Sequence, residues 1–176
     1  DGTTSASKYV VDTGSYSFFR NLKAAALILN KTDAVIAGSE LGGFDTHSNQ
    51  ADDLPRLLQE AGGALDSFYR DLAAITTAKG PAQDRVLVMG ISEFGRRPQE
   101  NNGGTDHGTA GLGFLLGKGV KGGLHADYPD LAKLDDNGNL RHTVDFRSLY
   151  ATVLDKWLGA NSGSILGTAY PSLGAL

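Results

Sequence analysis

The spacing of apolar side chains along the chain predicts three helices. In residues 18–30 the apolar side chains recur every three or four positions, so they share one face of a helix. A longer stripe of the same kind predicts a helix over residues 52–78, and a third is expected over residues 145–158. Asp145 suits the N-cap of the third helix and Gly159 its C-cap, because glycine tolerates the left-handed conformation that follows a helix.

Three short apolar runs predict strands between these helices. They cover residues 33–39, 85–91 and 113–116, and a long polar loop, residues 92–107, follows the second run. Strands that alternate with helices favour a mainly parallel sheet with helices on its faces, so we expect an α/β fold. A hairpin turn is expected at residues 135–139, which contain an Asn-Gly pair.

The chain contains no linker, repeat or low-complexity tract, so we expect a single domain or the C-terminal part of one. Residues 1–16 form a loose polar arm in this prediction, residues 17–160 the α/β body and residues 161–176 a C-terminal tail. Because the chain begins at Asp1 without an initiator Met or a signal-like segment, we expect a processed product or an excised piece of a longer protein.

Composition excludes several classes of protein. With 40% hydrophobic and 20% charged residues among 176, the chain is expected to fold rather than to be disordered. Its net charge of −4 argues against binding to nucleic acid or to an anionic membrane, and its longest apolar run, residues 24–29, is too short for a membrane span. The absence of cysteine excludes disulfides, cysteine-ligated zinc and a thiol nucleophile. The 24 glycines cluster beside acidic residues and histidines, which directs attention to three loops.

The first loop, residues 42–47, directly follows a predicted strand, where open α/β sheets bind their ligands. Asp45 and His47 stand two positions apart, so in an extended backbone both side chains point to the same side. A carboxylate together with an imidazole is half of a typical zinc, iron or manganese site. The alternative is that Asp45 caps the next helix while His47 is simply exposed.

The second loop, residues 92–97, follows the strongest predicted strand. Glu93 can act as a metal ligand or as a general base, and Arg96 and Arg97 can hold an anionic substrate group through paired hydrogen bonds. The alternative is a cluster of ion pairs on the surface. The spacing around Ser92 does not fit the G-x-S-x-G motif, so a serine-hydrolase site is excluded.

The third loop, residues 103–108, holds the adjacent pair Asp106 and His107 between glycines, which let a backbone approach a ligand closely. Both side chains can bind one metal, or each can bind a different metal. The alternative is an ordinary turn.

Three further signals are weaker. Residues 117–122 match the pattern G-x-G-x-x-G, but no helix follows them, which disfavours a nucleotide-binding protein. His142 is a further candidate ligand close to the start of the third helix. His125 is a lone histidine in a loop and is expected to be solvated.

The loops resemble those of the DUF1501 family, bacterial proteins of unassigned function. The resemblance covers about residues 18–160, and its matching stretches are residues 42–47, 92–110, 121–124, 128–131 and 145–159. It implies a three-layer α/β/α arrangement with a mainly parallel sheet, as in the alkaline phosphatase and sulfatase superfamily. It also implies a divalent metal at the strand ends, with zinc as the first choice and calcium, magnesium, manganese and iron as alternatives.

Carried onto this chain, the resemblance assigns site residues one by one. In the wider superfamily an Asp and a His of one loop hold one metal, and an adjacent Asp-His pair contributes to a second. The implied metal ligands are Asp45, His47, Asp106 and His107. Glu93 and Arg96 belong to the DUF1501 pattern, and we assign them catalytic roles.

Members of the family are longer than this chain, so the resemblance implies a C-terminal half whose sheet is incomplete. The nucleophile would then lie upstream. An incomplete sheet leaves apolar edges exposed, so the expected partner is the N-terminal half of the parent protein or a second copy. A small anionic ester is the expected substrate, and export to the periplasm is implied by the resemblance alone.

Two functions follow from these observations. The first is a metal-dependent hydrolase of phosphate or sulfate esters, or its C-terminal portion, in which metal ions stabilise the charge that develops on the ester oxygens. The alternative is a non-catalytic module for binding, assembly or surface display, with a vestigial or structural metal site.

Overall fold

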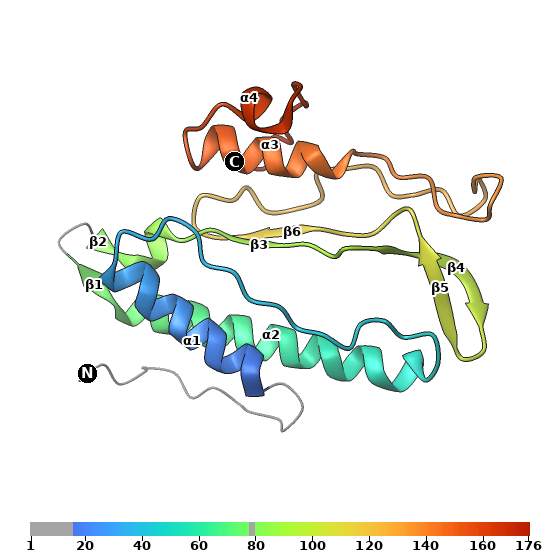
Figure 1. Ribbon diagram of the computed structural model, residues 1–176, viewed down its shortest axis with the longest axis horizontal. Coiled ribbons are helices and arrows are strands. Elements are labelled where there is room, and N and C mark those ends of the chain that lie inside the picture. The colour runs from blue at the N-terminus through green and yellow to red at the C-terminus, as the bar shows by residue number, and fades with distance from the viewer. Residues whose placement is uncertain (1–15, 78–79) are drawn as a thin grey trace. The chain divides into compact units, whose positions relative to one another are not determined.

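The computed structural model describes residues 16–77 and 80–176 (Figure 1). The chain divides into two compact units, Asp1–Val86 and Leu87–Leu176, and each is described by itself. Apart from Tyr16, which begins the first helix, the loose arm predicted for residues 1–16 lies outside the described residues. None of the helices in the described ranges is long and apolar enough to cross a membrane.

The first unit is built on two helices, as the apolar spacing predicted. Helix α1 covers Tyr16–Lys31 and helix α2 covers Gln50–Ala74. The second helix ends four residues earlier than predicted, because the chain turns at Ile75 into the short antiparallel pair β1 (Thr76–Thr77) and β2 (Gly80–Pro81). The 3-10 helix η1, Ala82–Arg85, follows directly.

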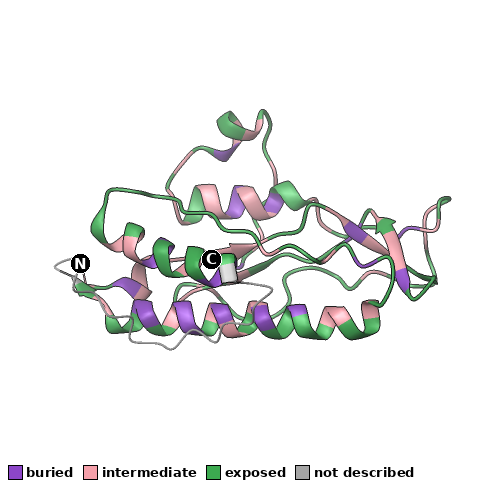
Figure 2. Cartoon of the chain, turned by 60° about the horizontal axis from the view of Figure 1, so that its bottom comes forward, coloured by how far each residue is buried: buried purple, intermediate pink, exposed green. Residues whose placement is uncertain are grey.

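The core of this unit lies between the two helices. Phe18 and Phe19 of α1 are buried together with Ala64 of α2, and their rings meet edge to face with centroids 6.3 Å apart. Buried side chains repeat along α2, as Figure 2 shows, with Leu57, Phe68 and Leu72 among them. Burial of large apolar side chains at helical spacing is the main stabilising contribution to such a helix pair.

The strand predicted at residues 33–39 is absent. The whole stretch 31–40 is exposed, and residues 33–40 have no secondary structure. Val35 and Ile36 are 73% and 75% exposed, although their β-branched side chains favour a buried strand. A strand needs a neighbouring strand for its backbone groups, and no described residue of this unit provides one beside residues 33–40.

The second unit contains four strands in two separate pairs. Strand β3, Val88–Gly90, pairs with β6, Phe114–Leu116, and β4, Gly95–Asn101, pairs with β5, Gly104–Gly108. Both pairs are antiparallel. The chain passes from β3 to β6 through the β4–β5 hairpin and not through a helix.

The predicted three-layer α/β/α fold with a mainly parallel sheet is therefore wrong. Each sheet in the described residues has two antiparallel strands. A parallel pair needs a long crossover connection, usually a helix, and the segment that joins the predicted strands 85–91 and 113–116 forms a hairpin instead. The order of predicted helices and strands along the chain did not indicate that a hairpin joins these two strands.

The last predicted helix is present with the predicted N-cap, Asp145, but its C-cap is Trp157 and not Gly159. Helix α3 covers Phe146–Lys156, and the Asp145 carboxylate accepts a hydrogen bond from the backbone N–H of Arg147. At the other end Gly159 has a φ of 64°, and the N–H of Ala160 donates to the carbonyl of Leu154 at 2.8 Å. This is the backbone pattern that favours glycine after a helix.

A buried threonine on α3 holds the C-terminal segment. Thr152 is fully buried, and its hydroxyl donates to the carbonyl of Ser148 and accepts from the N–H of Leu173, both within 2.8 Å. The short helix α4, Ser162–Leu166, falls within the segment 161–176 that was predicted as a tail. Small side chains on α3 thus let a second piece of backbone approach the helix closely.

The start of α3 is expected to weaken in acid. The hydrogen bonds and charge of Arg147 lower the pKa of Asp145 from 3.8 to about 2. A carboxyl whose pKa is depressed by folding stabilises the folded state above its ordinary pKa, and this contribution is lost as the pH falls through its folded pKa. Between about pH 5 and pH 2 the thermal midpoint of the parent protein should fall more steeply than that of Asp145→Asn, whose amide still caps the helix but does not titrate. Thermal melts followed by far-ultraviolet circular dichroism measure both slopes, and equal slopes would contradict the expectation.

Candidate functional site

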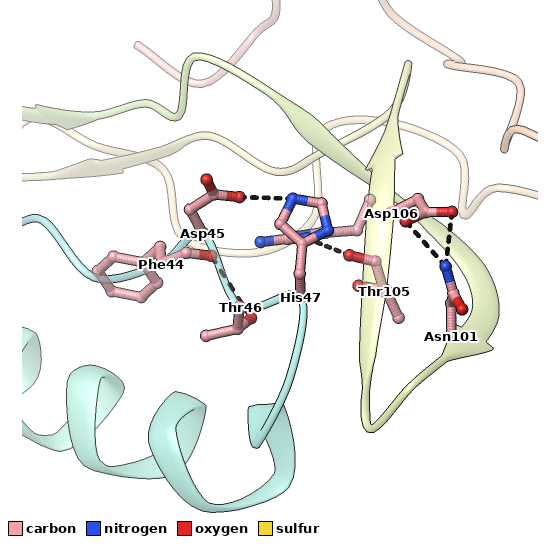
Figure 3. A network of polar contacts seen from close by, with 8 residues as sticks. Phe44, Asp45, Thr46, His47, Asn101, Thr105 and Asp106 are labelled. Carbon is pink, nitrogen blue, oxygen red and sulfur yellow. Dashed lines mark hydrogen bonds and ion pairs between the residues drawn. The ribbon is translucent and has the colours of Figure 1, made fainter.

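Asp45 and His47 form a close pair in the loop that precedes α2. The Asp45 Oδ1 and His47 Nε2 atoms are 2.9 Å apart (Figure 3). Two short backbone hydrogen bonds shape the loop, from the N–H of Thr46 to the carbonyl of Phe44 at 2.9 Å and from the N–H of His47 to the carbonyl of Asp45 at 3.2 Å. Thr46 is buried between the two exposed polar side chains and thereby anchors the loop.

The alternative in which Asp45 caps the next helix is wrong. The N-cap of α2 is Asn49, whose φ of 52° is left-handed and whose side chain makes no capping hydrogen bond. The Asp45 carboxylate is instead paired with His47, and both side chains are more than half exposed. Gly43, at the base of the loop, has a φ of 96°, and a Cβ atom there would meet the side chain of Leu57 at 3.2 Å. The loop therefore needs glycine at this position.

The segment predicted as a polar loop, residues 92–107, is for the most part a β-hairpin. Its turn is Asn102-Gly103, with φ values of 57° and 79°. Positive φ at both central residues is typical of the tight turns whose twist matches that of the paired strands. The hairpin predicted at residues 135–139 is wrong: the Asn-Gly pair there forms a turn, but residues 117–145 contain no strand.

A bulge in β4 lies opposite Asp106. Arg96 pairs with His107 and Glu100 pairs with Thr105, so the three residues Arg97–Gln99 lie opposite a single residue of β5. Pro98 has no N–H to donate to the ladder, which suits it to a bulge. The bulge bends β4 and changes the direction of the side chains that leave it.

Asp106 and His107 lie on opposite faces of β5, because successive side chains of a strand alternate. The side-chain amide of Asn101 donates toward both oxygens of Asp106 at 3.2 Å (Figure 3). His107 is stacked on the ring of Phe94, with centroids 4.0 Å apart and planes 9° from parallel. The sequence left open whether Asp106 and His107 bind one metal or two. Because the two side chains point to opposite faces of β5, the structure favours a different metal for each.

The two predicted catalytic residues stand in different surroundings. Arg96 donates to the carbonyl of Thr105 and lies over the ring of Phe94, 4.9 Å from its centroid. Glu93 is exposed in a short turn in which the hydroxyl of Ser92 donates to the carbonyl of Phe94 at 2.9 Å. Their roles in catalysis stay predictions.

Each of the two units holds a group of the predicted residues. Asp45 and His47 form one pair in the first unit. In the second unit Arg96, Asp106 and His107 lie on the β4–β5 hairpin, and Glu93 lies in the turn just before it. Sequence reasoning missed Asn101 and Phe94, which contact Asp106 and His107. The Asn-Gly pair at residues 102–103 was the signal that could have placed Asn101 near Asp106, since it fixes the register of the hairpin.

Comparison with protein families gives one match. A family model described as "Protein of unknown function (DUF1501)" matches residues 5–166. The chain belongs to the DUF1501 family. This confirms the family resemblance, and the match extends past both ends of the predicted range 18–160.

The DUF1501 chain matches no curated protein and no solved structure at a significant level. The placement of the chain in the alkaline phosphatase and sulfatase superfamily, and as the C-terminal half of a longer protein, stays a prediction.

Proposed function

We propose that this DUF1501 protein binds divalent metal and acts in the hydrolysis of phosphate or sulfate esters. The observation that carries the proposal is the Asp45–His47 pair, in which a carboxylate oxygen and an imidazole nitrogen lie 2.9 Å apart. Oxygen and nitrogen donors at this separation can bind the same small cation, and zinc accepts both types of donor. The reaction class comes from the family resemblance alone. The predicted three-layer fold was wrong, so the fold gives the reaction class no support.

The fit of a metal to this pair rests on its donor chemistry. The backbone hydrogen bonds of residues 44–47 hold both side chains on one loop, so little conformational entropy remains to be lost on binding. Both side chains reach solvent, which gives a cation an entry path. Asp106 and His107 are the second set of proposed ligands, each on its own face of β5. When bound, a divalent metal would polarise the ester and stabilise charge on its oxygens.

Glu93 and Arg96 would have different roles, and only Glu93 would act on the substrate directly. Glu93 is exposed and carries a carboxylate that can accept or donate a proton in the reaction. Arg96 is held by the carbonyl of Thr105 and by the ring of Phe94, so in this proposal it keeps the hairpin and its His107 in position.

The alternative, a non-catalytic module for assembly, is favoured by a different observation. Residues 31–40 are exposed throughout, and Val35 and Ile36 present apolar side chains to solvent. Exposed apolar segments without strand partners are typical of surfaces that a partner covers. The partner in this alternative is the N-terminal part of a longer parent protein or a second copy of the chain.

One experiment separates the two functions. The purified protein is loaded with zinc, dialysed and analysed by elemental mass spectrometry, and then incubated with a panel of aryl phosphates and aryl sulfates. Retained zinc with ester turnover supports the hydrolase. Retained zinc without turnover supports the module with a structural metal, and protein that retains no zinc contradicts the metal assignment.

A further inference from the structure

One arginine of the hairpin has no hydrogen-bond or ion-pair partner among the residues that the structure describes. Arg97 is partly buried, and its Nε atom is buried without an acceptor. In the part of the chain that the structure describes, residues 16–77 and 80–176, each of the other arginines has a hydrogen bond, ion pair or ring contact. Its neighbour Arg96 is occupied by the carbonyl of Thr105 and the ring of Phe94.

A guanidinium without a partner among the described residues, in a partly buried position, is suited to bind an anion. The group stays charged at every physiological pH, and removal of its N–H donors from water without an acceptor is unfavourable. Proteins therefore pair such groups with carboxylates or with ligands. No acidic residue among those described is paired with Arg97. A bound anion would supply the acceptor that Arg97 lacks among the described residues.

The geometry of the side chain indicates how a ligand would approach. Only Nε is buried, so the terminal nitrogens Nη1 and Nη2 are the donors that reach solvent. Two parallel donors in a plane match two oxygens of one oxyanion. Arg97 begins the bulge of β4, where Pro98 restricts the backbone, so the guanidinium leaves a stiff part of the hairpin. A donor held in place before binding loses less entropy than a flexible one.

We propose that Arg97 is the anion-binding residue of the hairpin and takes a tetrahedral oxyanion, phosphate or sulfate, end-on through Nη1 and Nη2. The choice of a tetrahedral oxyanion over a carboxylate rests on the proposed function. The sequence predicted anion binding by Arg96 or Arg97. This assignment gives the role to Arg97 alone, because Arg96 is engaged within the hairpin.

The test measures anion binding without metal, so that it is independent of the metal assignment. The full chain, treated with a chelator, is titrated with inorganic phosphate and with sulfate by calorimetry. Arg97→Gln is expected to weaken binding at least about tenfold, and Arg97→Lys to keep part of it, because a lysine retains the charge but loses the fork. Arg141→Gln, in an exposed loop, is the matched control and should bind as the parent does.

Thermal stability gives a second readout. Phosphate should raise the unfolding midpoint of the parent protein and of Arg141→Gln, but not that of Arg97→Gln, since a ligand stabilises only the folded state that binds it. The variant is expected to fold, because it loses an unpaired charge and no observed contact. Equal phosphate affinity in the parent and Arg97→Gln, no binding by the parent, or acetate binding as tight as phosphate binding would each overturn the proposal. If the parent protein takes up no zinc but still binds phosphate through Arg97, only the proposed function is overturned.

Discussion

Replacement of Gly95 by alanine is expected to lower the free energy of unfolding by about 3 kcal/mol, the upper end for overpacking of a well-packed site. A Cβ atom at position 95 would overlap the carbonyl group of Ala110, which is backbone and has no rotamer to escape into. That carbonyl also accepts a hydrogen bond from the N–H of Arg96 at 3.2 Å. Relief of the overlap would therefore break this bond and displace the start of β4.

Chemical denaturation of the parent and the Gly95→Ala variant measures this effect, with the midpoint as the readout. Gly62→Ala is the matched control, because a Cβ atom there meets nothing within 4 Å and the residue lies inside α2. Alanine should stabilise that helix by about 0.5–1 kcal/mol. If the denaturation midpoint falls for Gly95→Ala and rises for Gly62→Ala, close packing at Gly95 is the cause of the lost stability. An unchanged midpoint for Gly95→Ala would contradict the packing of Ala110 against β4.

The helices were predictable because their signals are local. The stripe of apolar residues in α2 and the Asp145 cap of α3 depend on residues within one or two turns, and both are found where the sequence placed them. Strand pairing depends on residues far apart along the chain, which the pattern of a single run does not reveal. Val35 and Ile36 have the side chains of a buried strand and yet are exposed.

The hairpin shows how one overlooked turn changed the expected fold. The Asn102-Gly103 pair lies inside a polar stretch, so its flanks lack the alternation of apolar and polar residues that marks most strands. Its strands are held by backbone pairing, and by side chains such as Asn101 against Asp106 and Phe94 against His107. A hairpin at this turn reverses the direction of the chain between the strand at residues 88–90 and the strand at residues 114–116. These two strands then pair antiparallel, and no parallel sheet is expected.

The candidate site was predictable in its residue types and not in its geometry. The spacing of Asp45 and His47 indicated a shared side, and the two side chains do meet at 2.9 Å. For Asp106 and His107, adjacency in sequence indicated proximity, but the alternation of a strand directs the two side chains to opposite faces. The distinction between Arg96 and Arg97 depends on burial and partners, which no sequence pattern contains.

Replacement of His47 by alanine is expected to lower zinc affinity at least a hundredfold at the Asp45–His47 pair. The variant removes one of two donors that lie 2.9 Å apart, and a single exposed carboxylate retains a zinc ion poorly at neutral pH. His107→Ala should likewise reduce the zinc content, because His107 is a proposed ligand on β5 of the second unit. His125→Ala is the matched control, because His125 contacts the backbone carbonyl of Lys121 and lies outside both groups.

Zinc content after dialysis, measured by elemental mass spectrometry beside circular dichroism for folding, decides among these expectations. His47 and His107 are both exposed, so truncation at either position creates no cavity and the fold should be retained. A decrease in each single variant, with a further decrease in the double variant and none in His125→Ala, would support both His47 and His107 as metal ligands. Because exposed histidines also bind zinc weakly and without selectivity, the decisive quantity is the difference between His47→Ala and His125→Ala. Equal zinc content in these two variants and the parent would exclude the Asp45–His47 pair as a metal site, and the assembly module would become the better supported function.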